Sequence, residues 1–256
     1  MLWPRTVGGM APHAFADALA ARRVLGVSRR AKYVVLALSG GATVLVHLRM
    51  SGRLTLIAAG DPTPLHARLW LELDDARRLV FSDTRKFGRW LLTADPERVL
   101  ARMGPEPLSP AFTREHLRRA LAARRRMLKP LLLDQTFVAG LGNIYADESL
   151  WRARLHPCRR SDAVTPAEAA RLHRAIRTVL RQAIRLNGTS LGNGQANFRG
   201  GDGRRGGNQN HLRVFRRTGA PCPRCGTPIE RRLVGQRSTH VCPCCQRTPD
   251  RDRTAA

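Results

Sequence analysis

The hydrophobic pattern divides the chain into two halves with different periods. As far as residue 92, short runs rich in Val and Leu alternate with turn residues, a pattern typical of β-strands. Ser39-Gly-Gly-Ala42 predicts one hairpin turn, Asp74-Asp75 predicts another, and the last run predicts an edge strand. The expected elements are a short Ala-rich helix at 14–22 and strands at 23–27, 33–38, 43–48, 54–57, 69–73, 79–81 and 89–92. Short strands at this spacing indicate a sandwich or barrel.

Beyond residue 110 the apolar positions recur with a helical period. Thr165-Pro-Ala-Glu168 has the form of a capping box with proline at the first helical position, and Gly188 suits the C-terminal cap of that helix. The glycine-rich stretch 189–207 predicts a loop. The expected helices lie at 114–126, 127–135, 144–155 and 165–187.

These patterns together predict an α+β protein whose N-terminal part is an antiparallel β-sandwich. The expected divisions are a β domain at 1–95, a proline-rich linker at 96–110, a helical domain at 111–215, a cysteine-containing hairpin at 216–248 and a tail at 249–256.

The charge balance indicates a polyanionic partner. The chain has 45 basic and 19 acidic residues, a formal net charge of +26, which exceeds what an ordinary solvated surface requires. No apolar run is long enough to span a membrane, and the first residues lack the hydrophobic core of a signal peptide. We therefore expect a cytoplasmic protein whose cysteines bind metal.

Four cysteines near the C-terminus have the spacing of a zinc site. Cys222 and Cys225 form one pair and Cys242 and Cys245 form a second, with sixteen residues between the two pairs. Four thiolates complete the tetrahedral coordination of one Zn²⁺, so the expected role is structural. Two alternatives stay open: Cys244 could replace Cys245, and the cysteines could be free or disulfide-bonded. The segment between the pairs carries donors suited to phosphate oxygens, including Arg231, Arg232 and Arg237.

Six stretches, in this order, resemble the formamidopyrimidine-DNA glycosylases, base-excision enzymes related to endonuclease VIII. They are Arg29-Arg-Ala-Lys-Tyr33, His47-Leu-Arg-Met-Ser-Gly52, Asp83-Thr-Arg-Lys-Phe-Gly88, Gly104-Pro-Glu-Pro-Leu108, Gly140-Leu-Gly-Asn-Ile-Tyr-Ala-Asp-Glu-Ser-Leu150 and Gly235-Gln-Arg-Ser-Thr239. The resemblance implies a sandwich, a helix–two-turns–helix domain and a zinc finger. It also implies a monomer that acts on damaged double-stranded DNA at the nucleoid, removing oxidised purines such as 8-oxoguanine and formamidopyrimidines by base flipping and Schiff-base chemistry.

The same resemblance implies roles for individual side chains. Lys32 and Arg237 match catalytic positions: Lys32 contacts phosphate and donates a proton, and Arg237 grips the phosphates of the flipped nucleotide. Wedges that fill the gap left by the flipped base are implied at Met50, Arg85 and Phe87. DNA contacts are implied at His66, Arg85, Arg124, Lys129 and Asn143. From the residues alone, an apolar Met50 or Phe87 is more typical of a core residue than of a wedge, and Lys32 could be a solvated strand end.

The beginning of the chain departs from the family pattern. Members begin Met-Pro-Glu-Leu-Pro, and the resemblance implies that the terminal proline is the nucleophile and the glutamate the acid. Here residue 2 is Leu and no Pro-Glu follows, so the sandwich is expected to be truncated. We favour a start assigned too far downstream over a truncated gene product, and we expect the chain as written to bind DNA but cleave it poorly. The alternatives are an inactive protein that binds damaged or abasic DNA, and an RNA-binding or ribosomal zinc protein.

Overall fold

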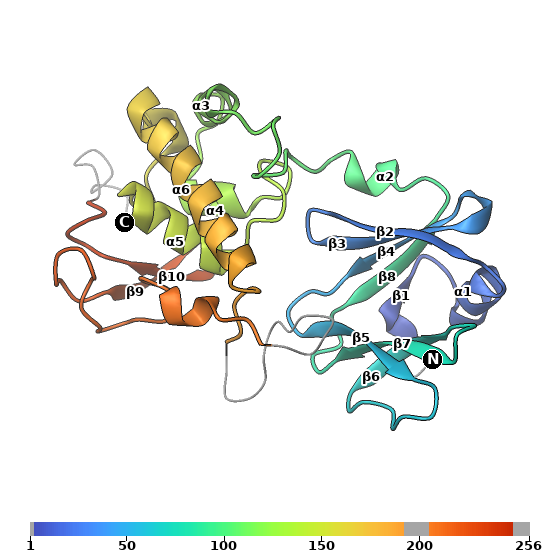
Figure 1. Cartoon of the computed structure of the whole chain (residues 1–256). Coiled ribbons are helices and arrows are strands. Elements are labelled where there is room, and N and C mark those ends of the chain that lie inside the picture. Colours follow the sequence, from blue (N-terminus) through green and yellow to red (C-terminus); the bar gives the residue numbers. More distant parts are fainter. Residues whose placement is uncertain (1–2, 192–204, 248–256) are drawn as a thin grey trace. The chain divides into compact units, whose positions relative to one another are not determined.

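The computed structural model describes residues 3–191 and 205–247, and the chain divides into two compact units. The first unit comprises Met1–Arg102 with Leu186–Gln209, and the second comprises Met103–Arg185 with Asn210–Ala256 (Figure 1). The secondary structure is of mixed α+β class, as the sequence predicts. No helix among the described residues has the length and apolar character that crossing a membrane requires.

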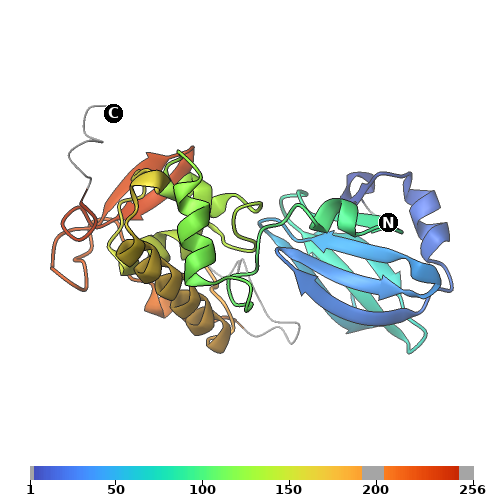
Figure 2. The same ribbon diagram turned by 90° about the horizontal axis from the view of Figure 1, so that it is seen from above.

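The first unit is a β-sandwich. A five-stranded sheet has the order β1-β8-β4-β3-β2, and a three-stranded sheet has the order β5-β7-β6. Figures 1 and 2 show the two sheets stacked in layers. The elements are η1 Pro4–Thr6, β1 Val7–Gly8, α1 Pro12–Leu19, β2 Val24–Arg30, β3 Tyr33–Leu38, η2 Ser39–Gly41, β4 Thr43–His47, β5 Gly52–Ala58, β6 Ala67–Glu72, β7 Arg77–Asp83, β8 Arg89–Thr93 and α2 Glu97–Leu100.

The core of this unit lies between the sheets. Val44, Val46 and Trp90 of the larger sheet and Phe81 of the smaller sheet are fully buried, and the rings of Phe81 and Trp90 meet edge-on at 5.9 Å. Val44 and Val46 are two positions apart in β4, so their side chains point to the same face of the larger sheet and into this core. The expected sandwich is confirmed.

Two sequence predictions about this sheet are wrong. The run at 89–92 was expected to form an edge, but β8 lies between β4 and β1 inside the larger sheet. The sheet was also expected to be wholly antiparallel, but β1 pairs with β8 in parallel, Val7 opposite Trp90. A two-residue strand is too short to produce a hydrophobic pattern of its own, so the sequence could not reveal the neighbour that covers β8.

Both expected hairpin turns are present. β3 and β4 pair antiparallel across Ser39–Gly41, where Gly40 and Gly41 have φ of 72° and 73°. Left-handed backbone of this kind suits glycine because a Cβ would be strained there. β6 and β7 pair antiparallel across the Asp74-Asp75 turn.

The second unit is helical, with a terminal hairpin. Its elements are α3 Arg114–Ala122, α4 Leu128–Leu133, α5 Asn143–Ala153, η3 Ser161–Ala163, α6 Pro166–Arg185, η4 Asn208–His211 (of which Asn208 and Gln209 are grouped with the first unit), β9 Glu230–Val234 and β10 Arg237–Val241. The apolar faces of α3, α4, α5 and α6 share one buried core that includes Leu117, Leu131, Leu150 and Ile176. The helical domain and the terminal hairpin expected from the sequence are both observed.

Helix α6 begins as its sequence predicts. Glu168 accepts the backbone N–H of Thr165 at 2.9 Å, and Thr165 Oγ1 accepts the backbone N–H of Glu168 at 3.3 Å. This reciprocal pair is a capping box. After the helix ends at Arg185, Asn187 and Gly188 turn the chain with φ of 54° and 84°.

The glycine-rich loop predicted at 189–207 lies partly outside the described residues. Residues 192–204, including Asn193, Gln195 and Asn197, are not described. At its far end the Gly206 N–H donates to Ser190 Oγ at 3.0 Å.

Candidate zinc centre and nucleic-acid interface

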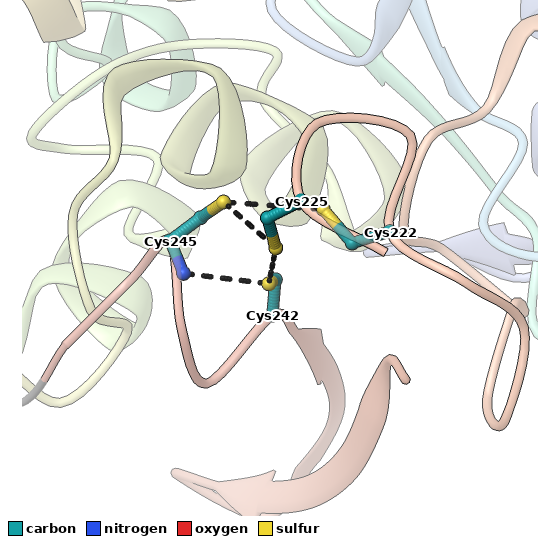
Figure 3. A group of neighbouring side chains, drawn as sticks. All are labelled: Cys222, Cys225, Cys242 and Cys245. Carbon is teal, nitrogen blue, oxygen red and sulfur yellow. Dashed lines mark hydrogen bonds between the residues drawn. The ribbon is translucent and has the colours of Figure 1, made fainter. Parts of the chain in front are cut away.

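Four cysteines gather where the chain enters and leaves the hairpin β9–β10 (Figure 3). The Sγ atoms of Cys222, Cys225, Cys242 and Cys245 all lie within 4.8 Å of one another, and Cys225 Sγ is 3.4 Å from both Cys242 Sγ and Cys245 Sγ. Tetrahedral zinc with Zn–S bonds of about 2.3 Å separates its sulfurs by about 3.8 Å, so the cluster has metal-ligand spacing. None of the four is in a disulfide. Cys244 is exposed and outside the cluster, which decides the open pairing in favour of Cys245.

The cluster is attached to helix α5 by packing and by a hydrogen bond. The indole N–H of Trp151 donates to Cys222 Sγ at 3.4 Å. Trp151 and Cys222 also share a small buried core with Val214, Ile229 and Cys242. An N–H donor directed at a thiolate sulfur stabilises its negative charge, so α5 provides part of the outer shell that a tetrathiolate metal centre needs.

A cavity of about 460 Å³ opens beside the thiols Cys225 and Cys245. Four arginines line it: Arg154, Arg159, Arg224 and Arg247. Arg224 also lies over the Trp151 ring, 4.3 Å from its centroid. Zn²⁺ bound by four thiolates carries a net charge of −2, and guanidinium groups next to it offset that charge. The donor set, the spacing and the surrounding charge therefore all fit one structural Zn²⁺.

The hairpin turn packs against helix α4. Gly235 and Gln236 have φ of 55° and 59°, the combination that a two-residue turn of type I′ requires. A Cβ on Gly235 would lie 2.8 Å from Pro130 Cγ, so only glycine fits this approach. Arg237, the first residue of β10, is exposed immediately after the turn.

The side chain of Gln135 bridges both ends of the segment between α4 and α5. Gln135 Nε2 donates to the carbonyls of Leu133 and Leu141, and Gln135 Oε1 accepts the Gly140 N–H at 2.9 Å. Helix α5 then begins at Asn143, whose preceding residue Gly142 has no side chain to cap it. A helix start without a side-chain cap suits an anion, because the N-terminal end of a helix carries partial positive charge. Asn143 Nδ2 donates to the carbonyl of Ser238 in β10 at 3.0 Å.

The DNA contact predicted for the Lys129 side chain is wrong in this structure. Lys129 is completely buried, and its ammonium lies 2.6 Å from Asp147 Oδ1, 2.8 Å from the Ser238 carbonyl and 2.7 Å from Thr239 Oγ1. An ammonium group has three N–H donors, so none remains for a phosphate. The helical pattern could not reveal this because the partners come from distant segments.

Arg124 is turned back onto its own helix and the following loop. Its guanidinium donates to the Ala120 carbonyl at 3.0 Å and lies over the Phe137 ring at 5.2 Å. The next residue, Arg125, projects outward with 79% of its side chain exposed, 3.3 Å from Asp162. The sequence reasoning did not select Arg125.

In the first unit, the three predicted wedge residues come together from two loops. Arg85 Nη1 lies 2.9 Å from Met50 Sδ, and the Arg85 guanidinium carbon lies 5.0 Å from the centre of the Phe87 ring. Met50 and Phe87 remain 53% and 49% exposed, which is unusual for large apolar side chains. Neither is a core residue, so the alternative left open by the sequence is excluded.

A residue that the sequence reasoning missed organises these loops. Asp83 is buried, and its carboxylate accepts the hydroxyl of Ser51 and the backbone N–H groups of Arg85 and Gly88, the last at 2.7 Å. A Cβ on Gly88 would collide with the Phe81 ring, so this turn also requires glycine. An aspartate at the start of a turn was the available signal.

Lys32 lies at the same end of the sandwich as the wedge loops. It directly precedes β3, where Tyr33 pairs with His47. His47 in turn pairs with Arg89, which follows the loop 84–88 that carries Arg85 and Phe87. Burial, followed by the charges of Arg49 and Lys32, lowers the pKa of His47 to about 4. His47 is therefore neutral at pH 7, and Nδ1 accepts the Arg49 N–H at 3.0 Å.

His66 is exposed next to this region. It has φ of 64°, and its carbonyl accepts the backbone N–H of Asp83 at 3.0 Å. Thus the structure gathers Lys32, Met50, His66, Arg85 and Phe87 in the first unit and Asn143 and Arg237 in the second.

Comparison with known proteins gives a consistent result along the chain. Residues 1–90 match the family model described as the formamidopyrimidine-DNA glycosylase N-terminal domain, residues 103–194 match its H2TH domain, and residues 219–248 match the zinc finger found in FPG and IleRS. The formamidopyrimidine-DNA glycosylase of a Roseiflexus species is 50% identical over 247 residues, covering 96% of this chain and 89% of that protein. That of Herpetosiphon aurantiacus is 47% identical, covering 95% and 89%.

Solved structures agree. The MutM (Fpg) protein of Thermus thermophilus superposes with a TM-score of 0.84 at 44% identity, covering 95% of this chain and 88% of that one. A Lactococcus lactis Fpg bound to DNA with an abasic site has a TM-score of 0.86 at 34% identity, covering 96% and 90%. The four-cysteine cluster is thus the structural zinc site of a zinc finger. The chain belongs to the formamidopyrimidine-DNA glycosylase family, a family of DNA-repair enzymes with glycosylase and AP lyase activity.

Proposed function

We propose that this protein acts on oxidised purines, such as 8-oxoguanine and formamidopyrimidines, in double-stranded DNA, and that it does so as a monomer after flipping the damaged nucleotide out of the helix. The relatives support a DNA partner, since Lactococcus lactis Fpg has been solved with DNA that contains Fapy-dG or an abasic site. The observation that carries the proposal is the grouping of Met50, Arg85 and Phe87 on two loops braced by Asp83.

These three side chains have complementary chemistry for a base stack. Met50 and Phe87 present exposed apolar surface that can enter the gap left by an extruded nucleotide. Arg85 has donors that can pair with the acceptor groups of the base left without a partner. Because Asp83 fixes the loops beforehand, little ordering entropy is lost when the wedges enter the duplex.

The remaining residues act on the backbone. We propose that Arg237 and Asn143 hold the phosphates beside the flipped nucleotide, together with the first N–H groups of α5. Lys32 is proposed to contact phosphate near the lesion and to donate a proton, and His66 and Arg124 to contact the DNA backbone. For Arg124 this requires the guanidinium to leave Phe137 and Ala120.

The lesion class is tested by binding. Duplexes that differ at one position only, with 8-oxoguanine, thymine glycol, an abasic analogue or undamaged guanine, are compared at one salt concentration. We expect the abasic and 8-oxoguanine duplexes to bind at least about tenfold more tightly than the undamaged duplex, with weaker binding to thymine glycol. Equal affinity for damaged and undamaged duplexes would contradict the proposal and would fit a protein that binds nucleic acid by charge alone.

Two further measurements separate enzyme from binding module. The fluorescence of 2-aminopurine placed opposite or beside the lesion reports unstacking, and chromatography reports release of free 8-oxoguanine. Unstacking with release supports the proposed enzyme. Tight abasic binding with unstacking but without release identifies the second candidate, a module that recognises damaged DNA without chemistry.

A further inference from the structure

A buried charged network joins helices α4 and α5 to strand β10. Lys129 and Asp147 are both fully buried and form an ion pair of 2.6 Å. The same ammonium donates to the Ser238 carbonyl at 2.8 Å and to Thr239 Oγ1 at 2.7 Å. Asp147 Oδ2 accepts the backbone N–H of His240 at 2.9 Å. Three consecutive residues of β10 are therefore held by two side chains from the helices.

These bonds converge on the two residues proposed to hold phosphate. The Ser238 carbonyl accepts from both Lys129 Nζ and Asn143 Nδ2, so it lies between them. Thr239 Oγ1, which accepts from Lys129, donates to the carbonyl of Arg237 at 2.9 Å. Alternation along a strand puts the side chains of Arg237 and Thr239 on the same face of β10.

Stability alone does not account for a buried pair of this kind. Removing two charges from water is costly, and two apolar side chains of similar size stabilise a core equally well or better. Burial does lower the pKa of the Lys129 ammonium, although the Asp147 carboxylate opposes the shift. An apolar pair, however, could not bond the Ser238 carbonyl or the Thr239 hydroxyl. Those two bonds are what the lysine specifically provides.

We propose that Lys129 is a positioning residue that sets the geometry of Arg237 and Asn143 for phosphate, without touching DNA itself. This inference rests on the proposed function of those two residues. Asp147 neutralises the lysine and fixes the next residue of the strand. The network thus couples the start of α5 to the first residue of β10 through a single carbonyl and a single hydroxyl.

The dependence of binding on salt distinguishes positioning from contact. Each cation that neutralises a phosphate contributes about one unit to the slope of log affinity against log salt. For K129M we expect about ten- to hundredfold weaker binding to an abasic-analogue duplex, with the slope of the unmodified protein. For R237Q, the matched control at a proposed contact, we expect the slope to fall by about one. A fall of about one in K129M would overturn the inference.

A second variant keeps the test valid if K129M is unstable. Lys129→Met combined with Asp147→Asn removes both buried charges and leaves an oxygen to accept the His240 N–H. We expect its zinc content and unfolding midpoint to match the unmodified protein, while its DNA affinity stays as low as that of K129M. Recovery of full affinity would show that only the charge balance mattered and would overturn the proposal.

The double-mutant cycle tests whether Lys129 acts through Arg237. If it does, K129M should weaken binding by a smaller factor in R237Q than in the unmodified protein, because only Asn143 remains to be positioned once Arg237 is absent. Independent, multiplicative effects would overturn the inference. The proposed function is tested separately, by the preference of the unmodified protein for abasic over intact duplex in the same titrations. The inference about Lys129 depends only on the affinities of the variants relative to one another.

Discussion

Asp83 Oδ2 accepts the backbone N–H of Gly88 at 2.7 Å, closing the loop that carries Arg85 and Phe87. The other carboxylate oxygen accepts the Ser51 hydroxyl from the loop that carries Met50. One buried carboxylate therefore ties both wedge loops to the end of β7. The proposed wedge depends on this residue, although Asp83 itself does not face solvent.

Replacing Asp83 by alanine should damage both stability and lesion preference. It removes the acceptor of the buried Gly88 N–H and of the partly buried Ser51 hydroxyl and Arg85 N–H, and we expect a loss of about 2–4 kcal/mol in the free energy of unfolding. Lesion binding should fall even at temperatures where the variant is folded. Urea unfolding and duplex titration measure the two effects. Asp75→Ala is the control, because Asp75 is half-exposed and pairs with the exposed Arg77 on the surface. If the two variants behaved alike, Asp83 would have no organising role.

In contrast to Asp83→Ala, substitutions of the exposed wedge residues should weaken lesion binding with little effect on stability. Because Met50 and Phe87 are about half exposed, Met50→Ala and Phe87→Ala should change stability by no more than about 0.5 kcal/mol. Loss of stacking on a base should weaken lesion binding by about 1–3 kcal/mol for Phe87. Leu65→Ala is the matched control, since Leu65 is an apolar residue 82% exposed in the same unit. Lesion preference equal to that of the control would exclude the wedge.

The comparison of sequence and structure shows which inferences depend on local signals. The capping box at Thr165 and Glu168, the glycine turns and the cysteine spacing are local, and the structure confirms all three. Helix α3 ends at Ala122 and not at 126 as its propensity predicted. There the backbone of Arg126 accepts the Ser161 N–H at 2.9 Å, and this tertiary pairing outweighs helix propensity.

The sequence identified candidate site residues but did not predict how their side chains contact one another. Met50, Arg85 and Phe87 could be selected from the resemblance, but their contact with one another depends on Asp83. Nothing in the sequence around Lys129 distinguishes it from a lysine on the surface of a helix. Its burial follows from Asp147, eighteen positions further on in α5, and from β10, over a hundred positions away. Side-chain pairing at such separations has no signature in one sequence.

Serine substitutions at the adjacent residues Cys244 and Cys245 should have different effects on zinc binding. Cys245→Ser removes a ligand, so we expect zinc content to fall well below one per chain and the hairpin β9–β10 to lose its order. DNA affinity should fall with it, because the hairpin carries Arg237. Cys244→Ser should retain one zinc and full affinity, since Cys244 lies outside the cluster. Elemental analysis of the two purified variants, with amide exchange in 230–241, measures these effects. Loss of zinc from Cys244→Ser would restore the alternative pairing.

The carboxyl group of Glu148 should contribute more to stability as pH falls, the opposite of a carboxyl group whose pKa is lowered by folding. Burial raises the pKa of Glu148, although three backbone N–H groups, those of Arg213, Val214 and Phe215, oppose the shift. A carboxyl group with a raised pKa binds more protons in the folded state than in the unfolded state between the two pKa values. Its contribution to stability therefore grows as pH falls through the raised pKa towards the ordinary value near 4.5, and it is lost as pH rises.

Glu148→Gln isolates this effect from the other carboxylates. Its amide oxygen can still accept the N–H groups of Val214 and Phe215, which both donate to Oε1, but the group no longer titrates, so the pH dependence that Glu148 contributes should disappear. The difference in unfolding free energy should shift in favour of the unmodified protein as pH falls towards 4.5. Urea unfolding of both proteins at several pH values between 4.5 and 7.5 measures this difference. A difference that does not vary with pH would show that Glu148 has the same pKa folded and unfolded.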